Sequence, residues 1–220
     1  MPSTMIWTMP GGREGILIRT IQTQAAGQRG ISEPCVVVEA AARVFSEMPY
    51  DRVSLAHIAA EANIDLATLQ THFTTTDDIA ANVLDVQQER MTEVLSRVME
   101  SEASSLDHLL ALIHGVAAVM ASDSLVQAGM ALVDSLPEDL QDTGHGFYEE
   151  WQNVTETLIA EGIADGSVTS TQPTGDLAEL LNEIFVGAQI LSGMQDRWTS
   201  LPKRIRLAEP VILSLLVPRR

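Results

Sequence analysis

The side chains that could perform acid–base chemistry are few and widely spaced. Three histidines and three carboxylates stand out between residues 108 and 150: His108, His114, Asp134, His145, Glu149 and Glu150. HExxH and CxxC spacings are absent, as are the GxSxG, Walker and GxGxxG motifs, so the sequence shows no metal-binding or catalytic motif. We therefore expect no metal and no cofactor. Acid–base work by one of these groups with a shifted pKa is the alternative.

Charge limits the partners that the chain can bind. The net charge is −17, from 13 basic and 30 acidic residues, and Lys203 is the only lysine. DNA binding draws affinity from Lys and Arg neutralising phosphates, so this composition opposes it unless the basic residues cluster. The single cysteine, Cys35, excludes an intrachain disulfide and fits a reducing cytoplasm. We expect neither a signal peptide nor a membrane span.

Apolar residues recur at helical spacing and no strand pattern is found, so we expect an all-α protein. Residues 1–30 are expected to form a flexible arm. Ser54, Asp65 and Thr76 are the expected helix N-caps, and Asn63 the expected left-handed turn residue. Pro210 is expected to kink or restart the last helix. Helices are predicted at 33–48, 54–62, 65–73, 77–102, 106–121, 125–136, 147–164, 176–194 and 204–216.

Two short helices joined by a tight turn, with one helix before and a long helix after, make a helix-turn-helix arrangement. The run AARVFSEMPYDRVSLAHIAAEANIDLATLQTHFTTTDDIAANVL resembles the TetR family signature over about 50 residues. The stretches SDSLVQAGMALVD, FYEEWQNV and FVGAQILSG look more loosely like the γ-butyrolactone receptor branch. The resemblance implies a dimer of all-helical subunits. Each has a three-helix helix-turn-helix domain, here 31–80, and a larger ligand-binding and dimerisation domain, here 81–220.

The helix-turn-helix departs from the family pattern where DNA contacts belong. Family members usually open the recognition helix with Ser or Thr and then Lys, where this chain has Asp65 and Leu66. They usually have Tyr where Gln70 stands and Lys where Thr76 stands. Residues 31–80 hold two arginines against eight carboxylates. We therefore expect DNA binding to be weakened or lost. The remaining candidates for contacts with DNA are Arg52, Thr68, Gln70, Thr71, His72 and the arm arginines Arg13, Arg19 and Arg29.

The most informative residue for ligand binding is Trp151. In the γ-butyrolactone receptor branch a tryptophan at the matching place lines the ligand pocket, so the resemblance implies that role for Trp151. Small-molecule pockets are mostly apolar with few polar groups. For any one apolar residue, core packing is the alternative. The other candidate wall residues are Met120, Val126, Met130, Val133, Phe147, Val154, Phe185 and Gln189.

The sequence thus predicts a cytoplasmic homodimer that binds a small apolar molecule in its C-terminal domain. By resemblance it is a ligand-responsive transcriptional regulator, with DNA as a partner that the charge disfavours. One alternative is a repurposed protein without DNA binding, either a small-molecule-binding protein or an enzyme of a secondary-metabolite pathway. Another is an interaction protein that forms mixed dimers with a DNA-competent relative. The apolar segment LAELLNEIFVGAQILSGM and the final helix are the expected dimer contacts.

Overall fold

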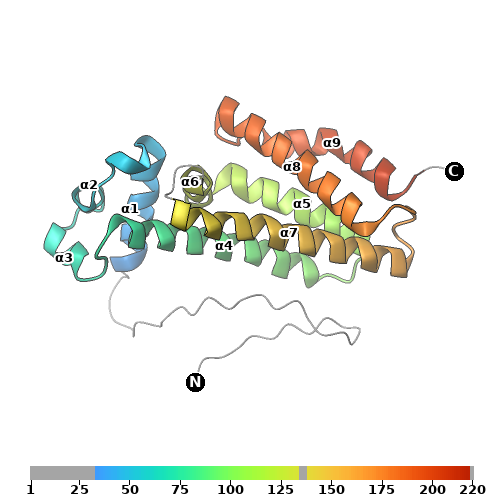
Figure 1. Cartoon of the computed structure of the whole chain (residues 1–220), viewed down its shortest axis with the longest axis horizontal. Helices are drawn as coiled ribbons and strands as arrows, with labels where there is room; N and C mark the ends of the chain where they lie inside the picture. The colour runs from blue at the N-terminus through green and yellow to red at the C-terminus, as the bar shows by residue number, and fades with distance from the viewer. Residues whose placement is uncertain (1–32, 134–137, 219–220) are drawn as a thin grey trace, which may run out of the picture. The chain divides into compact units, whose positions relative to one another are not determined.

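The computed structural model describes residues 33–133 and 138–218. Side chains are described from residue 36 onward in the first range and from residue 148 onward in the second. The predicted arm and the side chains of Cys35, Asp134, His145 and Phe147 lie outside the described residues. Within these ranges the chain is all-helical and has no strand, as predicted. The elements (Figure 1) are α1 (Glu33–Glu47), η1 (Tyr50–Arg52), α2 (Leu55–Glu61), α3 (Leu66–Gln70), α4 (Thr76–Met99), α5 (Ser105–Ser122), α6 (Ser124–Val133), α7 (Glu138–Asp165), α8 (Thr174–Asp196) and α9 (Leu201–Leu216).

The helix-turn-helix consists of α2 and α3. The hydroxyl of Ser54 accepts a hydrogen bond from the backbone N–H of His57, and the carboxylate of Asp65 accepts one from the N–H of Thr68. Asn63 has φ 54°, the left-handed conformation that its short polar side chain tolerates. These three local predictions are confirmed, because capping and turn chemistry depend on neighbouring residues alone.

The N-cap of α4 is Thr75 and not the predicted Thr76. Thr75 has an extended backbone (φ −131°), and its hydroxyl accepts from the N–H of Asp78 at 3.0 Å. The carboxylate of Asp78 accepts in return from the N–H of Thr75 at 2.8 Å. This reciprocal pair is a capping box, and it moves the helix start one residue earlier than the acidic residues alone suggested.

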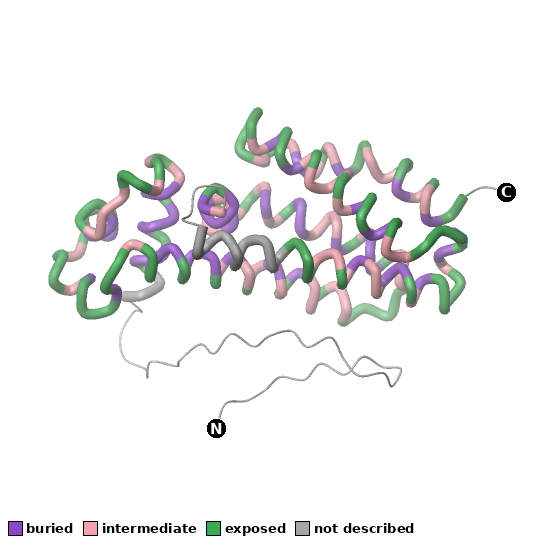
Figure 2. The backbone as a smooth tube through the Cα atoms, in the orientation of Figure 1, coloured by how far each residue is buried: buried purple, intermediate pink, exposed green. Residues whose placement is uncertain are grey.

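The buried side chains form two cores. Figure 2 marks the buried residues in purple along the backbone. The first core belongs to the helix-turn-helix end and includes Ile58, Leu69 and Ile79. The second fills the bundle of α5, α7, α8 and α9 and includes Leu109 and Leu158. Two helices contribute to both cores. Helix α4 supplies Ile79, Ala80, Val83 and Leu84 to the first and Met91 and Val94 to the second, and α6 supplies Ala128 and Leu132 to the first and Val126 and Met130 to the second.

Two helix predictions need correction or qualification. Helix α7 begins at Glu138, nine residues before the predicted start. Pro210 lies inside α9, which continues from Leu201 to Leu216.

Helix α5 is, among the described residues, the one segment long and apolar enough to cross a membrane by length and composition. It packs against α4, α6, α7 and α9, and the core helix of a soluble protein passes the same test. This helix is therefore weak evidence for a membrane span.

Candidate functional site

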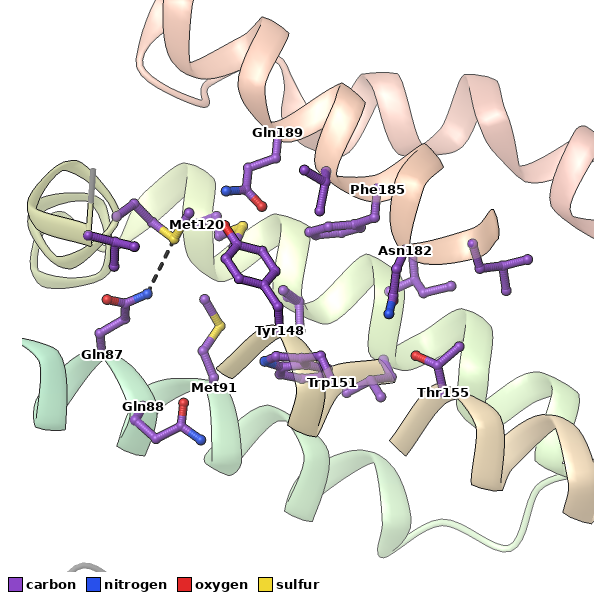
Figure 3. Close-up of a pocket in the computed structure, with 17 residues that line it drawn as sticks. Gln87, Gln88, Met91, Met120, Tyr148, Trp151, Thr155, Asn182, Phe185 and Gln189 are labelled. Carbon is purple, nitrogen blue, oxygen red and sulfur yellow. Dashed lines mark hydrogen bonds between the residues drawn. The ribbon is translucent and has the colours of Figure 1, made fainter. Parts of the chain in front are cut away.

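The described part of the C-terminal domain contains a pocket between α4, α5, α6, α7 and α8 (Figure 3). It has an empty volume of about 870 Å³, which includes the space at its open mouth. Trp151 and Tyr148 enter from α7, Phe185 from α8 and Met120 from α5. Trp151 is half-buried and packs against the second core, whereas Tyr148 is 42% exposed. The space is therefore partly enclosed and lined by aromatic and thioether groups.

The pocket gathers six of the nine residues predicted to bind ligand. Val126 instead is fully buried in the second core, and Val154 packs against that core without lining the pocket. The side chain of Phe147 lies outside the described residues. The six predicted residues that line the pocket are Met120, Met130, Val133, Trp151, Phe185 and Gln189.

Sequence reasoning missed the contribution of α4. This helix was expected to connect the two domains, but Gln87, Gln88 and Met91 project from it into the wall of the pocket. The only sequence signal was the four-residue spacing of Gln87 and Met91, which places them on one helix face. The other lining residues that were missed are Leu112, Ile113, Val116, Tyr148, Thr155, Leu181, Asn182 and Val186.

Gln87 is the polar residue with the most unusual surroundings. Its side chain is 6% exposed, and its Nε2 donates to the thioether sulfur of Met130 at 3.2 Å. Its Oε1 is buried and has no hydrogen-bond partner within the described part of the chain. Gly129 on α6 makes room for it, because a Cβ at this position would lie 2.1 Å from Oε1 and 3.0 Å from the Cβ of Gln87. The carboxamide is therefore wedged between α4 and α6.

We expect Gly129→Ala to destabilise the fold by about 1–3 kcal/mol, because the added methyl overpacks the α4–α6 contact. Gly175→Ala on α8 is the matched control, since the nearest atom to its Cβ position is Glu156 Oε1 at 3.6 Å, an ordinary van der Waals distance, and it should change the stability by less than about 1 kcal/mol. Chemical denaturation measures both. Adding Gln87→Ala should restore most of the stability that Gly129→Ala loses. Equal stability of the two glycine variants would contradict this account of the contact.

Four of the five predicted DNA-contact residues that the structure describes lie in α3 or directly after it, and Arg52 lies in η1. Arg52, Gln70, Thr71 and His72 are exposed, and Thr68 is half-buried. The hydroxyl of Thr68 donates to Asp65 Oδ2 at 2.6 Å, and the hydroxyl of Thr71 donates to the backbone carbonyl of Thr68 at 2.7 Å. Both hydroxyl protons are thus used within the helix. In this arrangement neither threonine can donate to a phosphate.

The ionisable side chains of the helix-turn-helix leave this face negatively charged. The hydrogen bonds from the hydroxyl and the backbone N–H of Thr68 hold the pKa of Asp65 below its usual value, so Asp65 is ionised at neutral pH. The guanidinium of Arg43 is paired with Glu61, with Nε and Oε1 2.6 Å apart. Among the described residues up to 80, Arg52 is the cation left without an ion pair.

The helix-turn-helix and the all-helical fold are shared with known proteins. Residues 37–83 match the family model described as bacterial regulatory proteins, tetR family. No curated protein matches the chain. The TetR family protein CprB from Streptomyces coelicolor, solved with its biological operator sequence, is 20% identical over 84% of this chain and 89% of that chain, with a TM-score of 0.69.

Two further solved structures share the fold. A γ-butyrolactone receptor (ArpA-like protein) is 20% identical over 84% of this chain and 88% of that chain, with a TM-score of 0.63. SmeT, the repressor of a Stenotrophomonas maltophilia multidrug efflux pump, was solved with triclosan. That complex is 16% identical over 83% of this chain and 90% of that chain, with a TM-score of 0.70. The N-terminal helix-turn-helix domain therefore belongs to the tetR family of bacterial regulatory proteins, within a chain that has the fold of γ-butyrolactone receptors.

Proposed function

We propose that this protein is a cytoplasmic homodimer that binds a small, largely apolar molecule in the pocket beside Trp151 and changes its regulatory activity in response. The observation that carries this proposal is the pocket itself. Its walls are mostly apolar, with a few uncharged polar side chains among them, as is typical of small-molecule sites. The similar protein SmeT, whose structure contains triclosan, supports ligand binding within this fold.

The two helices shared by both cores supply a route from ligand to DNA-binding end. Helix α4 presents Gln87 and Met91 to the pocket and Val83 to the first core. Helix α6 presents Met130 to the pocket and Leu132 to the first core. A ligand that displaces Met91 or Met130 would shift both helices relative to the DNA-binding end. In a dimer this would alter the separation of two recognition helices, which must match half-sites about 34–36 Å apart.

Mass spectrometry of small molecules that co-purify with the protein from the cells that express it tests whether the pocket binds a ligand. We expect the purified protein to retain a small molecule and Trp151→Ala to retain at least about tenfold less, because an aromatic wall of the pocket is lost. Val154→Ala is the matched control on the same helix, because Val154 does not line the pocket. Equal retention by the protein and by Trp151→Ala would overturn the proposed site.

We further propose that DNA binding is weaker than in operator-binding relatives. The ionised Asp65, the internally bonded hydroxyls of Thr68 and Thr71, and the pairing of Arg43 each remove a contact that phosphate could use. These observations also favour the second candidate function, a protein that keeps the ligand site and has abandoned DNA. A mobility-shift assay with DNA from its own promoter region at about 50 mM salt separates them. No shift at micromolar protein would favour the second candidate.

The dimer contact that we propose is the outer surface of α8 and α9. Among the described residues this surface carries the most exposed large apolar side chains, Met194 at 80% and Leu207 at 71%, accompanied by Ile190, Leu191 and Val211. Exposed apolar patches mark protein interfaces, and α8 packs directly against α9, so we place the contact on these two helices. The domain division proposed from the sequence, between residues 80 and 81, falls within α4. Helix α4 therefore runs through both proposed domains.

A further inference from the structure

The carboxamide of Gln87 lacks adequate hydrogen-bonding partners in this structure. Its buried Oε1 has no partner among the residues that the structure describes, and buried polar groups are nearly always paired. Its Nε2 has only the thioether sulfur of Met130, which is a weak acceptor. Met130 itself lines the pocket, so the place occupied by its sulfur is within reach of a ligand. A polar ligand group at that place would give Gln87 a far stronger hydrogen bond.

Gln87 can meet either kind of polar group. Rotation of the carboxamide by half a turn about its terminal bond exchanges Nε2 and Oε1, which are nearly equal in size. A ligand hydroxyl could then accept from Nε2 or donate to Oε1. A ligand without a polar atom could do neither, and would leave the amide as poorly bonded as it is now. The position therefore discriminates between ligands by their hydrogen-bonding capacity.

The charge of the lining gives a second restriction. Among the described residues the polar side chains that line the pocket are four carboxamides, one hydroxyl, one phenol and one indole, with no Asp, Glu, Lys, Arg or His. Glu150 accepts from Nε2 of the lining residue Gln88 at 3.4 Å, so the formal charge bonded to the lining is negative. Burial of an ionised ligand group without a counter-charge is strongly unfavourable. A carboxylate or phosphate would therefore be excluded.

We propose that Gln87 is the residue that determines ligand specificity, and that it selects an uncharged molecule bearing a hydroxyl or comparable hydrogen-bonding group, which binds the carboxamide beside Met130. This inference rests on the proposed ligand-binding function of the pocket. It adds that the polar group of the ligand lies at the α4–α6 contact, where Gln87 meets Met130.

Three eight-carbon probes test the proposal by isothermal titration calorimetry at pH 8: 1-octanol, 1-chlorooctane and octanoate. We expect 1-octanol to bind and octanoate, which is ionised, to bind at least about tenfold more weakly. The decisive quantity is the ratio of the dissociation constants of 1-octanol and 1-chlorooctane. Gln87→Met should raise this ratio about tenfold, since it removes the hydrogen bond and keeps the side-chain length.

Asn82→Met is the matched control, because Asn82 is an exposed carboxamide on the same helix and does not line the pocket. It should leave the ratio within about twofold. An unchanged ratio in Gln87→Met, or octanoate binding as tightly as 1-octanol, would overturn the role of Gln87 while leaving the pocket intact. If no probe binds, or if Trp151→Ala binds all three with unchanged affinity, the ligand site proposed above fails and this inference fails with it.

Discussion

Duplex DNA should bind at least about 10²-fold more tightly once Asp65→Ser, Leu66→Lys and Thr76→Lys are combined. The three changes remove one negative charge and add two positive charges at the start of α3 and of α4. Serine also caps helices well, so α3 should remain folded without the carboxylate. Removing that carboxylate frees the hydroxyl of Thr68, which now donates to Asp65. Fluorescence anisotropy with a labelled 30-base-pair duplex at about 50 mM salt measures the gain.

The salt dependence of this gain reports its cause. Each new phosphate contact should steepen the slope of log affinity against log salt by roughly 0.9. A matched control places the same charges elsewhere, with Glu161→Ser, Ile163→Lys and Ala164→Lys near the end of α7. That variant should gain less than about threefold. If the control gains as much affinity as the first variant, the net charge of the protein limits DNA binding, and the placement of charges at α3 and α4 does not. Tight operator binding by the unaltered protein at 150 mM salt would contradict the proposed weakening.

The elements of the fold were predictable because local chemistry specifies them. Ser54 and Asp65 cap their helices and Asn63 makes the turn, as the sequence predicted. What the sequence could not show is how the side chain of Asp65 divides its bonds. A capping carboxylate needs to accept only from the backbone N–H of Thr68. The carboxylate of Asp65 also accepts a hydrogen bond from the hydroxyl of Thr68. That second bond removes Thr68 from the candidates for phosphate contact.

The pocket was predictable only in part, because it depends on how distant helices pack. Met130 and Val126 lie four residues apart on α6 and look alike in sequence. The structure buries Val126 completely while Met130 reaches the pocket wall. No local signal separates them. The difference arises from the approach of α4, whose Gln87 contacts Met130 and fits against Gly129.

Gln87 illustrates the same limit. In sequence it is one glutamine of a pair on a helix expected to link two domains, and both look like solvent-exposed residues. The structure buries Gln87 at 6% exposure and leaves Gln88 half-buried and bonded to Glu150. A pattern of polar residues cannot reveal which one faces a cavity when a second helix, α6, covers that face.

Met194→Glu combined with Leu207→Glu should weaken self-association by at least about 10²-fold, because each subunit would bury two uncompensated carboxylates in the α8–α9 contact. Both side chains are exposed in the isolated chain, so the substitutions should leave its fold intact. Ile163→Glu is the control, since it adds a carboxylate at an exposed apolar position on α7, outside the proposed contact. Sedimentation-equilibrium centrifugation at about 10 μM should find a dimer for the protein and the control and a monomer for the double variant. A dimer that survives both substitutions would show that α8 and α9 do not form the contact.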